Sequence, residues 1–389
     1  MAVIINSYNT ISAGTSNITK SALSWLETNN LSEKVYIFVP MLKIFEECQS
    51  KGNLRVIKLP VFSGPLKYLF RMLYDFILFP FATLIFKADL SIVIANYSPV
   101  KLKGRKIVIM RHPYLVDDSI YCKANFRTRL LELLRRVLFK LTLYSTEIVI
   151  AQSDYMKALL LKKYNIQENK VHVLHNPITE VAGLSVSANK YREGTPEKII
   201  LYVSRFYPHK NHDFLLKMAD NSKIFMRKEN MKIYITVNPA LGSAAQAFLN
   251  KISACQLDDI IINIGEIKNQ ALAEYYNKAK CLFFPSTSET FGNPLVEAMS
   301  FDLPIVVPDL GYARAVCEGA ALYYDPQNYE GAFNHLYALC TEQNLWKLYS
   351  MKSHEQLQKF PSIEQWIKTL FYFNPKINAV KEKDIRLNV

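Results

Sequence analysis

The residues best suited to chemistry are two glutamates eight positions apart, Glu289 and Glu297, on either side of an expected helix start. Four apolar residues, 281–284, predict a buried strand before them, and a polar loop follows. Pro294 suits the start of a helix, whose free N–H groups favour an anionic ligand such as a phosphate. A carboxylate would repel that phosphate, but it can accept hydrogen bonds from paired hydroxyls of a sugar or ribose. A plainer interpretation fits the spacing as well: Glu297 complements the helix dipole and Glu289 is solvated.

The stretch around these glutamates resembles the donor-binding signature of the retaining nucleotide-sugar glycosyltransferases of family 4. Their pattern, P-S-x-x-E-x-F-G-x-P-x-x-E-A-M, is matched by Pro285, Ser286, Glu289, Phe291, Gly292, Pro294, Glu297, Ala298 and Met299. One departure is Asp302, where the family usually has Gly before Leu-Pro, and we interpret it as a turn variation that leaves the donor site intact. The resemblance implies an α/β fold of GT-B architecture, with two facing Rossmann-like domains and a C-terminal helix crossing back to the first domain.

The resemblance also implies roles for the residues of this loop. Glu289 would orient the donor sugar, and Glu297 would bind the ribose. Phe291, Gly292 and Asn293 would line the donor between them. Farther along the chain, we expect a strand at residues 305–307 and a loop at residues 310–315. The family often has a Glu shortly after the Gly of that loop, and its absence here puts a sugar contact in the loop in doubt.

Two cations five residues apart, Arg205 and Lys210, follow an expected strand at residues 199–203. Such side chains can converge on a diphosphate, each charge-assisted bond contributing about 1.5 to 3 kcal/mol where water is partly excluded. Alone they would equally fit a solvated basic turn, but in the resembled family the cations at these positions hold the donor diphosphate. Gly265 and Ile267 end another expected strand, 260–264, where the family receives the nucleotide base largely through backbone contacts.

The first half of the chain contributes two further candidates. His112 follows an expected strand at residues 106–110, and open α/β sheets bind ligands at the carboxyl ends of their strands. It matches the family position from which a His reaches toward the donor sugar, although a surface His is the plainer alternative. Gly14 lies in an expected loop of small residues, 12–16, before a helix from about residue 17. Its backbone could approach a phosphate or an acceptor there, and a plain turn is the alternative.

Apolar strands alternate with helices, as in a parallel sheet wound by helices. The expected strands not yet mentioned are residues 2–5, 35–39, 54–59, 91–95, 147–152, 171–174 and 233–237. We divide the chain into an N-terminal acceptor-side Rossmann-like domain (1–180), a linker (181–197), a C-terminal nucleotide-sugar donor domain (198–355), helices that return to the first domain (356–375) and a charged tail (376–389). The linker is assigned because it has few apolar residues and contains Gly and Pro.

Composition restricts the class of protein. A hydrophobic content of 50% with only 12 Gly argues against disorder. The six Cys contain no C-x-x-C pair, which suits a reduced compartment and neither a zinc site nor a disulfide framework. The first residues lack the basic start and apolar core of a signal peptide, so we expect a cytoplasmic location. A net charge of +13 indicates a polyanionic partner, either nucleic acid or an anionic membrane surface.

Basic charge is concentrated in residues 101–140, which hold eleven Lys or Arg against three acids. Within them, residues 126–141 repeat apolar side chains at a helical period: Phe126, Leu130, Leu134, Val137, Leu138 and Leu141. The flanking cations are Arg127, Arg129, Arg135, Arg136 and Lys140. A basic amphipathic helix is typical of binding to an anionic membrane surface, and the alternative is a core-packing helix with a solvated basic face. Residues 66–86 are the most apolar stretch, but their uncharged run, 76–86, is too short to span a bilayer, leaving a buried or interfacial helix.

Three classes of protein remain as hypotheses. The leading one, implied by the resemblance, is a retaining glycosyltransferase at the inner face of the cytoplasmic membrane, acting on a lipid-linked glycan in bacterial O-antigen or capsule synthesis. No metal or cofactor is expected, because the acidic pairs 117–118 and 258–259 lack the D-x-D spacing. The second is another GT-B enzyme, such as a nucleotide-sugar epimerase. The third, a nucleic-acid-binding protein, is suggested only by charge, and no helix-turn-helix, zinc finger or RNP motif supports it.

Overall fold

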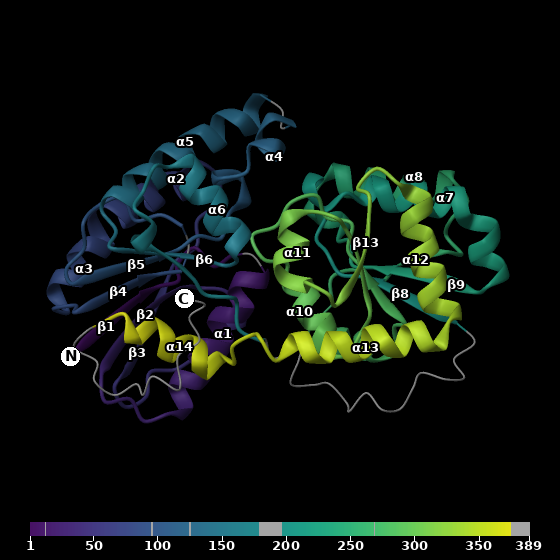
Figure 1. Ribbon diagram of the computed structural model, residues 1–389. Coiled ribbons are helices and arrows are strands. Elements are labelled where there is room, and N and C mark those ends of the chain that lie inside the picture. Colours follow the sequence, from purple (N-terminus) through teal and green to yellow (C-terminus); the bar gives the residue numbers. More distant parts are fainter. Residues whose placement is uncertain (12, 95, 124–125, 179–196, 268, 375–389) are drawn as a thin grey trace. The chain divides into compact units, whose positions relative to one another are not determined.

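The computed structural model describes residues 1–374 except 12, 95, 124–125, 179–196 and 268 (Figure 1). The chain divides into two compact units: the N-terminal unit, Met1–Pro177 with Pro361–Val389, and the C-terminal unit, Ile178–Phe360. The expected linker, apart from Glu197, and the expected tail lie outside the described residues.

The N-terminal unit is built on a parallel sheet in the order β3-β2-β1-β4-β5-β6-β7. Its strands are β1 Ala2–Asn6, β2 Lys34–Pro40, β3 Leu54–Leu59, β4 Leu90–Val93, β5 Arg105–Ile109, β6 Ile148–Ala151 and β7 Val171–Val173. Each strand expected in this half is confirmed, with ends displaced by no more than two residues. The strands read as continuous apolar runs because helices cover both faces of a parallel sheet.

The helices of this unit are α1 Ala13–Thr28, α2 Gly64–Leu73, α3 Phe79–Ile85, α4 Asp118–Lys123, α5 Phe126–Tyr144 and α6 Asp154–Lys163. The π-helical turn η2, Tyr74–Leu78, joins α2 to α3. The expected loop at residues 12–16 is wrong, because α1 already begins at Ala13 and Gly14 lies in its first turn. The buried stripe of Ile18, Leu23 and Leu26 stabilises α1 by packing, which outweighs the weak helix propensity of its small first residues.

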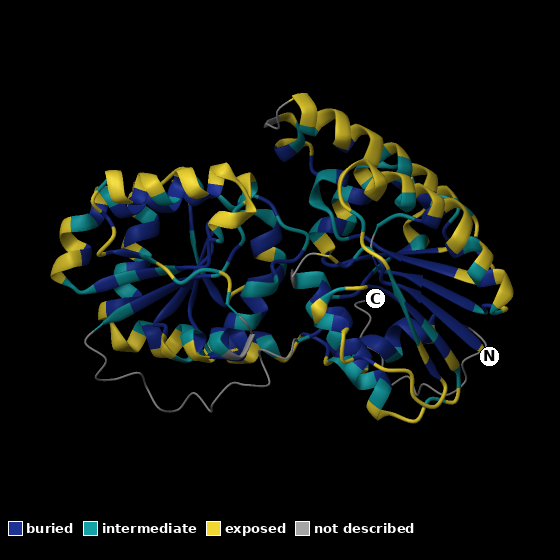
Figure 2. Ribbon diagram, turned by 180° about the vertical axis from the view of Figure 1, so that it is seen from behind, coloured by how far each residue is buried: buried dark blue, intermediate teal, exposed yellow. Residues whose placement is uncertain are grey.

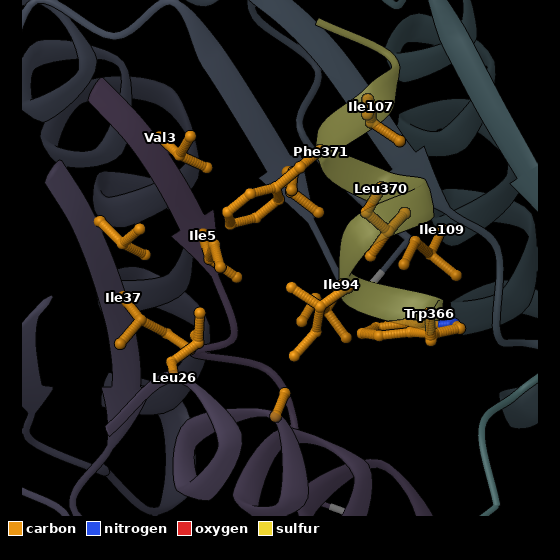
Figure 3. Close-up of a cluster of buried hydrophobic side chains, with 14 of the residues drawn as sticks. Val3, Ile5, Leu26, Ile37, Ile94, Ile107, Ile109, Trp366, Leu370 and Phe371 are labelled. Carbon is orange, nitrogen blue, oxygen red and sulfur yellow. The ribbon is translucent and has the colours of Figure 1, made fainter. Parts of the chain in front are cut away.

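The last helix of the described chain, α14 (Ile363–Tyr372), belongs to the N-terminal unit. Its side chains Trp366, Leu370 and Phe371 are buried among residues of β1, β2 and β5, as Figure 3 shows. A capping box between Ser362 and Gln365 fixes its first turn. The C-terminal helix therefore returns to the first domain as expected.

The C-terminal unit is a second parallel sheet, in the order β10-β9-β8-β11-β12-β13. Its strands are β8 Lys198–Tyr202, β9 Met231–Ile235, β10 Ile261–Asn263, β11 Cys281–Phe283, β12 Ile305–Pro308 and β13 Ala321–Tyr324. Its helices are α7 His212–Lys228, α8 Ser243–Ala254, α9 Asn269–Lys278, α10 Asn293–Ser300, α11 Gly311–Cys317, α12 Tyr329–Thr341 and α13 Gln343–Leu357.

Two elements of this unit differ from the expectation. The loop expected at residues 310–315 is largely helix, because α11 begins at Gly311 and buries Tyr312, Ala313 and Val316. Strand β13 was not predicted, since its four residues are too short a run to separate from a buried turn by pattern alone. Strand β13 pairs with β12 and forms the edge of the sheet.

Helix α5 turns its apolar stripe outward. Its buried residues are Glu132, Phe139, Thr142 and Leu143. Of the predicted stripe, Phe126, Leu130, Leu134, Val137 and Leu141 are exposed and only Leu138 is partly covered. The predicted stripe therefore does not pack into the core, although α5 packs there through Phe139 and Leu143. The exposed residues lie along the outer helices of this unit in Figure 2.

Helices α2 and α3 with the turn η2 form one apolar helix, Gly64–Ile85, which we call the apolar helix. By length and composition alone it could cross a membrane. Its inner face, Tyr74, Asp75, Phe79 and Thr83, is buried against the sheet. The exposed outer face includes Leu66, Leu69, Met72, Ile77, Phe81 and Leu84. Because one face packs on its own domain, the apolar helix lies along the surface of the N-terminal unit.

Candidate functional site

The candidate donor site lies in the C-terminal unit, where the strand order reverses. Strand β8 pairs with β9 on one side and with β11 on the other. The loops after β8 and β11 therefore leave the same edge of the sheet, at the topological position where such sheets bind ligands. Arg205 and Lys210 lie in the first loop and Glu289 in the second, so the structure brings together residues far apart in the sequence.

Hydrogen bonds of backbone groups and hydroxyls join the two loops independently of their charged side chains. The carbonyl oxygen of His209 accepts bonds from the backbone N–H of Thr287 at 2.7 Å and from the Ser286 hydroxyl at 3.1 Å. The Tyr202 hydroxyl donates to the carbonyl of Lys210 at 2.5 Å, and the Tyr312 hydroxyl donates to that of Ser286 at 2.6 Å. The loop conformations are thus set by the strands and helices beneath them.

The Glu289 side chain, only 12% exposed, forms an ion pair with the Lys210 ammonium. The Ser286 hydroxyl donates a further bond to Glu289 Oε1 at 2.7 Å. Burial favours the neutral acid, but the charges of Lys210 and His209 and these hydrogen bonds together lower the pKa of Glu289 below its ordinary value. The site therefore holds an ionised carboxylate, which can accept hydrogen bonds from ligand hydroxyls.

Arg205 has a carboxylate partner that sequence reasoning missed. Its Nε lies 3.1 Å from Glu266 Oε1, and Asn238 Nδ2 donates to the other oxygen of Glu266 at 3.1 Å. Glu266 stands between the two predicted base-contact residues, Gly265 and Ile267, and Gly265 has a left-handed φ of 71° that suits the sharp turn. The sequence signal that could have indicated this partner was an acidic residue next to a glycine at the end of an expected strand. The structure thus places Arg205 next to the loop after β10.

Gly292 precedes helix α10 in a left-handed conformation, with φ of 87°. This φ favours glycine, and a Cβ there would lie 2.9 Å from Leu295 Cδ1, so the Leu295 side chain would have to shift. Phe291 is 2% exposed and packs edge-on against Phe360, so its buried ring anchors the loop to the rest of the unit. Asn293 is the first residue of α10 and is partly exposed at the helix N-terminus.

Glu297 lies in the second turn of α10. The Tyr276 hydroxyl donates a hydrogen bond to its Oε2 at 3.1 Å. Burial raises the pKa of Glu297 to about 7, and the bond from Tyr276 only partly offsets it.

In the N-terminal unit, His112 ends the segment after β5 and begins the short turn Pro113–Leu115. Its Nε2 lies 2.9 Å from Glu132 Oε2 of helix α5, and its ring stacks on Tyr114 at 5.5 Å between centroids. Gly14 lies in the first turn of α1, after β1. Strands β1, β4 and β5 are neighbours, so both candidates lie at the carboxyl edge of this sheet.

Two family models match the chain. The model "Glycosyltransferase Family 4" matches residues 32–180, and "Glycosyl transferases group 1" matches residues 186–351. The chain belongs to these glycosyltransferases. In this glycosyltransferase, the family 4 match covers most of the N-terminal unit and the group 1 match covers most of the C-terminal unit. The group 1 match contains every candidate donor residue from Arg205 to Glu297.

Curated relatives of this glycosyltransferase include an O-antigen chain mannosyltransferase and an N-acetylgalactosaminyltransferase. The O-antigen chain mannosyltransferase RfbU of Salmonella typhimurium is 26% identical over 217 residues, 56% of this chain and 55% of that protein. The chain thus spans about half the length of this relative. The Campylobacter jejuni N-acetylgalactosamine-N,N'-diacetylbacillosaminyl-diphospho-undecaprenol 4-alpha-N-acetylgalactosaminyltransferase is 22% identical over 86% of this chain and 87% of its own.

The fold is also that of solved glycosyltransferases. The structure of Anabaena Alr3699/HepE in complex with UDP-glucose superposes with a TM-score of 0.72 over 96% of this chain and 99% of that one, at 14% identity. At this identity the likeness establishes the GT-B type of fold, two Rossmann-like domains with parallel sheets, as the resemblance implied.

Proposed function

We propose that this glycosyltransferase moves a sugar, with retention of configuration, from a nucleotide-sugar donor to a glycan acceptor in bacterial surface-polysaccharide synthesis. The observation that carries the proposal is the Lys210–Glu289 ion pair at the point where the order of the C-terminal sheet reverses. On this proposal the cation of the pair serves the diphosphate and its ionised carboxylate serves the sugar hydroxyls. The N-terminus of α10 and Glu297 follow within the same segment.

On this proposal the leaving diphosphate is neutralised by Arg205, Lys210 and the N-H groups of α10. These groups stabilise the charge that develops on the leaving group, which is the main way such a site lowers a barrier. Glu289 and His112 orient the sugar and Glu297 binds the ribose hydroxyls. The leaving phosphate oxygen accepts the proton of the acceptor hydroxyl on the face where the new bond forms, so retention needs no carboxylate nucleophile. The donor class is supported by the neighbour solved with UDP-glucose.

We infer that the acceptor is a glycan on a lipid carrier and that the enzyme works at the cytoplasmic face of an anionic membrane. The name of the Campylobacter relative describes an undecaprenol-linked acceptor. Two outward apolar faces of the N-terminal unit support the inference: the exposed stripe of α5 and the outer face of the apolar helix. Exposed apolar patches of this extent are uncommon on monomeric soluble proteins and mark binding surfaces.

The basic residues of α5 support binding to an anionic membrane surface. The structure distinguishes the cations that could contact lipid phosphates from those that pair within the domain. Arg127, Arg129 and Lys140 are exposed. Arg136, by contrast, donates to the Tyr114 carbonyl at 2.8 Å and pairs with Asp118, so it anchors α5 to its own domain. Arg135 pairs with Glu132. Three of the five predicted basic residues thus remain for lipid phosphates.

The test is turnover of purified full-length protein with a panel of nucleotide sugars, mannose donors included, and a synthetic lipid-linked acceptor. Transfer with the donor's anomeric configuration kept, as read by NMR of the product, is the expected result. An inverted product excludes the mechanism. Isomerised donor without acceptor use would favour an epimerase, and preference for duplex DNA over nucleotide-sugar would favour the nucleic-acid alternative. Turnover of Glu289→Gln should fall, and Glu330→Gln, which changes an exposed acid on α12, is its matched control.

A further inference from the structure

Helix α5 has a buried acid directly beneath its exposed apolar stripe. Glu132 is 3% exposed, while Leu130, Leu131, Leu133 and Leu134 on the same turns are between 45% and 56% exposed. Burying a carboxylate costs several kcal/mol unless specific partners compensate. An acid on the inner face of an otherwise leucine-rich helix therefore needs partners to explain it.

Among the described residues Glu132 has two partners, one on each oxygen. Oε2 lies 2.9 Å from His112 Nε2, and Oε1 pairs with the guanidinium of Arg135. Burial favours the neutral acid, but bonding to His112 and the charge of Arg135 lower the pKa of Glu132 below its ordinary value. The carboxylate is therefore ionised and can only accept hydrogen bonds.

We propose that Glu132 is the positioning residue of His112: it holds the imidazole with the proton on Nε2 and leaves Nδ1 for the substrate. An ionised carboxylate accepts, so Nε2 must donate, and in the neutral ring Nδ1 is then the acceptor. The ring plane is fixed from the other side by Tyr114, whose centroid lies 5.5 Å away. The helix that carries the outward apolar stripe thus also fixes the orientation of the candidate His.

The proposal rests on the proposed function for its kinetic readout but not for its structural one. Full-length protein with 15N-labelled histidine is compared with His112→Asn, which identifies the His112 signals among the seven histidines. The expected spectrum of neutral His112 has a protonated Nε2 and an unprotonated Nδ1. The opposite tautomer, or an equal mixture, in the native protein overturns the proposal even if no transfer activity is ever detected.

The second measurement is a double-mutant cycle with Glu132→Gln, which keeps shape but can donate as well as accept. Turnover is expected to fall roughly 10- to 100-fold, as for other residues that orient a functional histidine, with little change in donor KM. In Glu132→Gln the His112 signals should become a tautomer mixture. Glu132→Gln added to His112→Asn should cost no further turnover, because the first residue acts through the second.

Additive losses in the cycle would overturn the proposal, since Glu132 would then act independently of His112. Glu132→Gln with native turnover and native tautomer would overturn it as well. If Glu132→Gln does not fold, as judged by its thermal transition, the tautomer of the native protein alone decides. Loss of all transfer in every donor assay, with the Nε2-protonated tautomer intact, would count against the proposed function and not against this contact.

Discussion

Helices α5 and α7 are similar in length and each belongs to one of the two Rossmann-like units, but they use their apolar residues in opposite ways. Helix α7 buries eight of its 17 residues, among them Phe214, Leu215 and Met218. Helix α5 buries four of 19, and one of those is Glu132. A helical apolar period therefore identifies an amphipathic helix but not which environment its apolar face meets. In the C-terminal unit that face builds a core for the donor site, and in the N-terminal unit it is left outside.

The largest expected difference is in stability. Leu215→Ala on α7 removes a fully buried side chain and should lower the free energy of unfolding by about 2 to 5 kcal/mol. Leu134→Ala on α5, where the side chain is 56% exposed, should change it by less than about 0.5 kcal/mol. Urea unfolding of both variants is the measurement. Equal losses would mean that the α5 stripe is covered in the folded protein.

The next difference concerns the cations on α5. Changing Arg127, Arg129 and Lys140 together to Glu should abolish preference for anionic vesicles, because each basic residue contributes about 1 kcal/mol near an anionic leaflet. Binding of the native protein should weaken as salt rises, since the Debye length shortens. Co-sedimentation with anionic and neutral vesicles at low and high salt is the assay. The matched control is Lys217, Lys223 and Lys228 of α7 changed to Glu, which should bind like the native protein.

The third difference is between the kinetic effects of changing the two carboxylates of the donor site, Glu289 and Glu297. Glu289→Gln should lower turnover roughly 10- to 150-fold, corresponding to about 1.5 to 3 kcal/mol for a charge-assisted hydrogen bond. Glu297→Gln should mainly raise the donor KM, because the ribose is held equally in ground and transition states. Steady-state kinetics at saturating and low donor distinguishes the two. A KM effect for Glu289 with unchanged turnover would contradict its assignment to the sugar.

Sequence pattern was sufficient for the described strands other than β13 and for the turn before α10, because both depend on local order. The apolar runs of parallel strands and the glycine that precedes α10 are readable residue by residue. The partners of charged groups are not, since Glu266 reaches Arg205 across 61 positions and Glu132 reaches His112 across 20. Helix α11 was mistaken for a loop because its start at Gly311 looks like a turn, while its buried face is apparent only from packing. The outward stripe of α5 was undetermined for the same reason.

A smaller effect should appear in the pH dependence of donor binding. The pKa of Glu297 is raised by burial to about 7, so the folded protein favours the protonated acid. Its contribution to stability is thus fully present below the unfolded pKa and is lost as pH rises through about 7. Ribose hydroxyls bind the ionised form, so donor affinity should rise about tenfold between one unit below that pKa and the plateau above it. Calorimetric titration across this range tests it, and Glu297→Gln should show a flat profile.

The smallest expected effect is that of metal removal, and it contrasts the cations of the two units. Arg205 and Lys210 lie at the donor loops, each beside a carboxylate, whereas the exposed cations of α5 have no such role in the chemistry. With two side-chain charges and the N-terminus of α10 available to the diphosphate, the leaving group needs no Mg²⁺ on this proposal. Activity should be unchanged in EDTA, and adding Mg²⁺ should not raise it.

Turnover that disappears with the chelator and returns with Mg²⁺ would transfer the neutralising role from Arg205 and Lys210 to a bound metal. Lys210→Gln should then lose little activity in Mg²⁺, whereas on the metal-free proposal it should lose at least as much as Glu289→Gln.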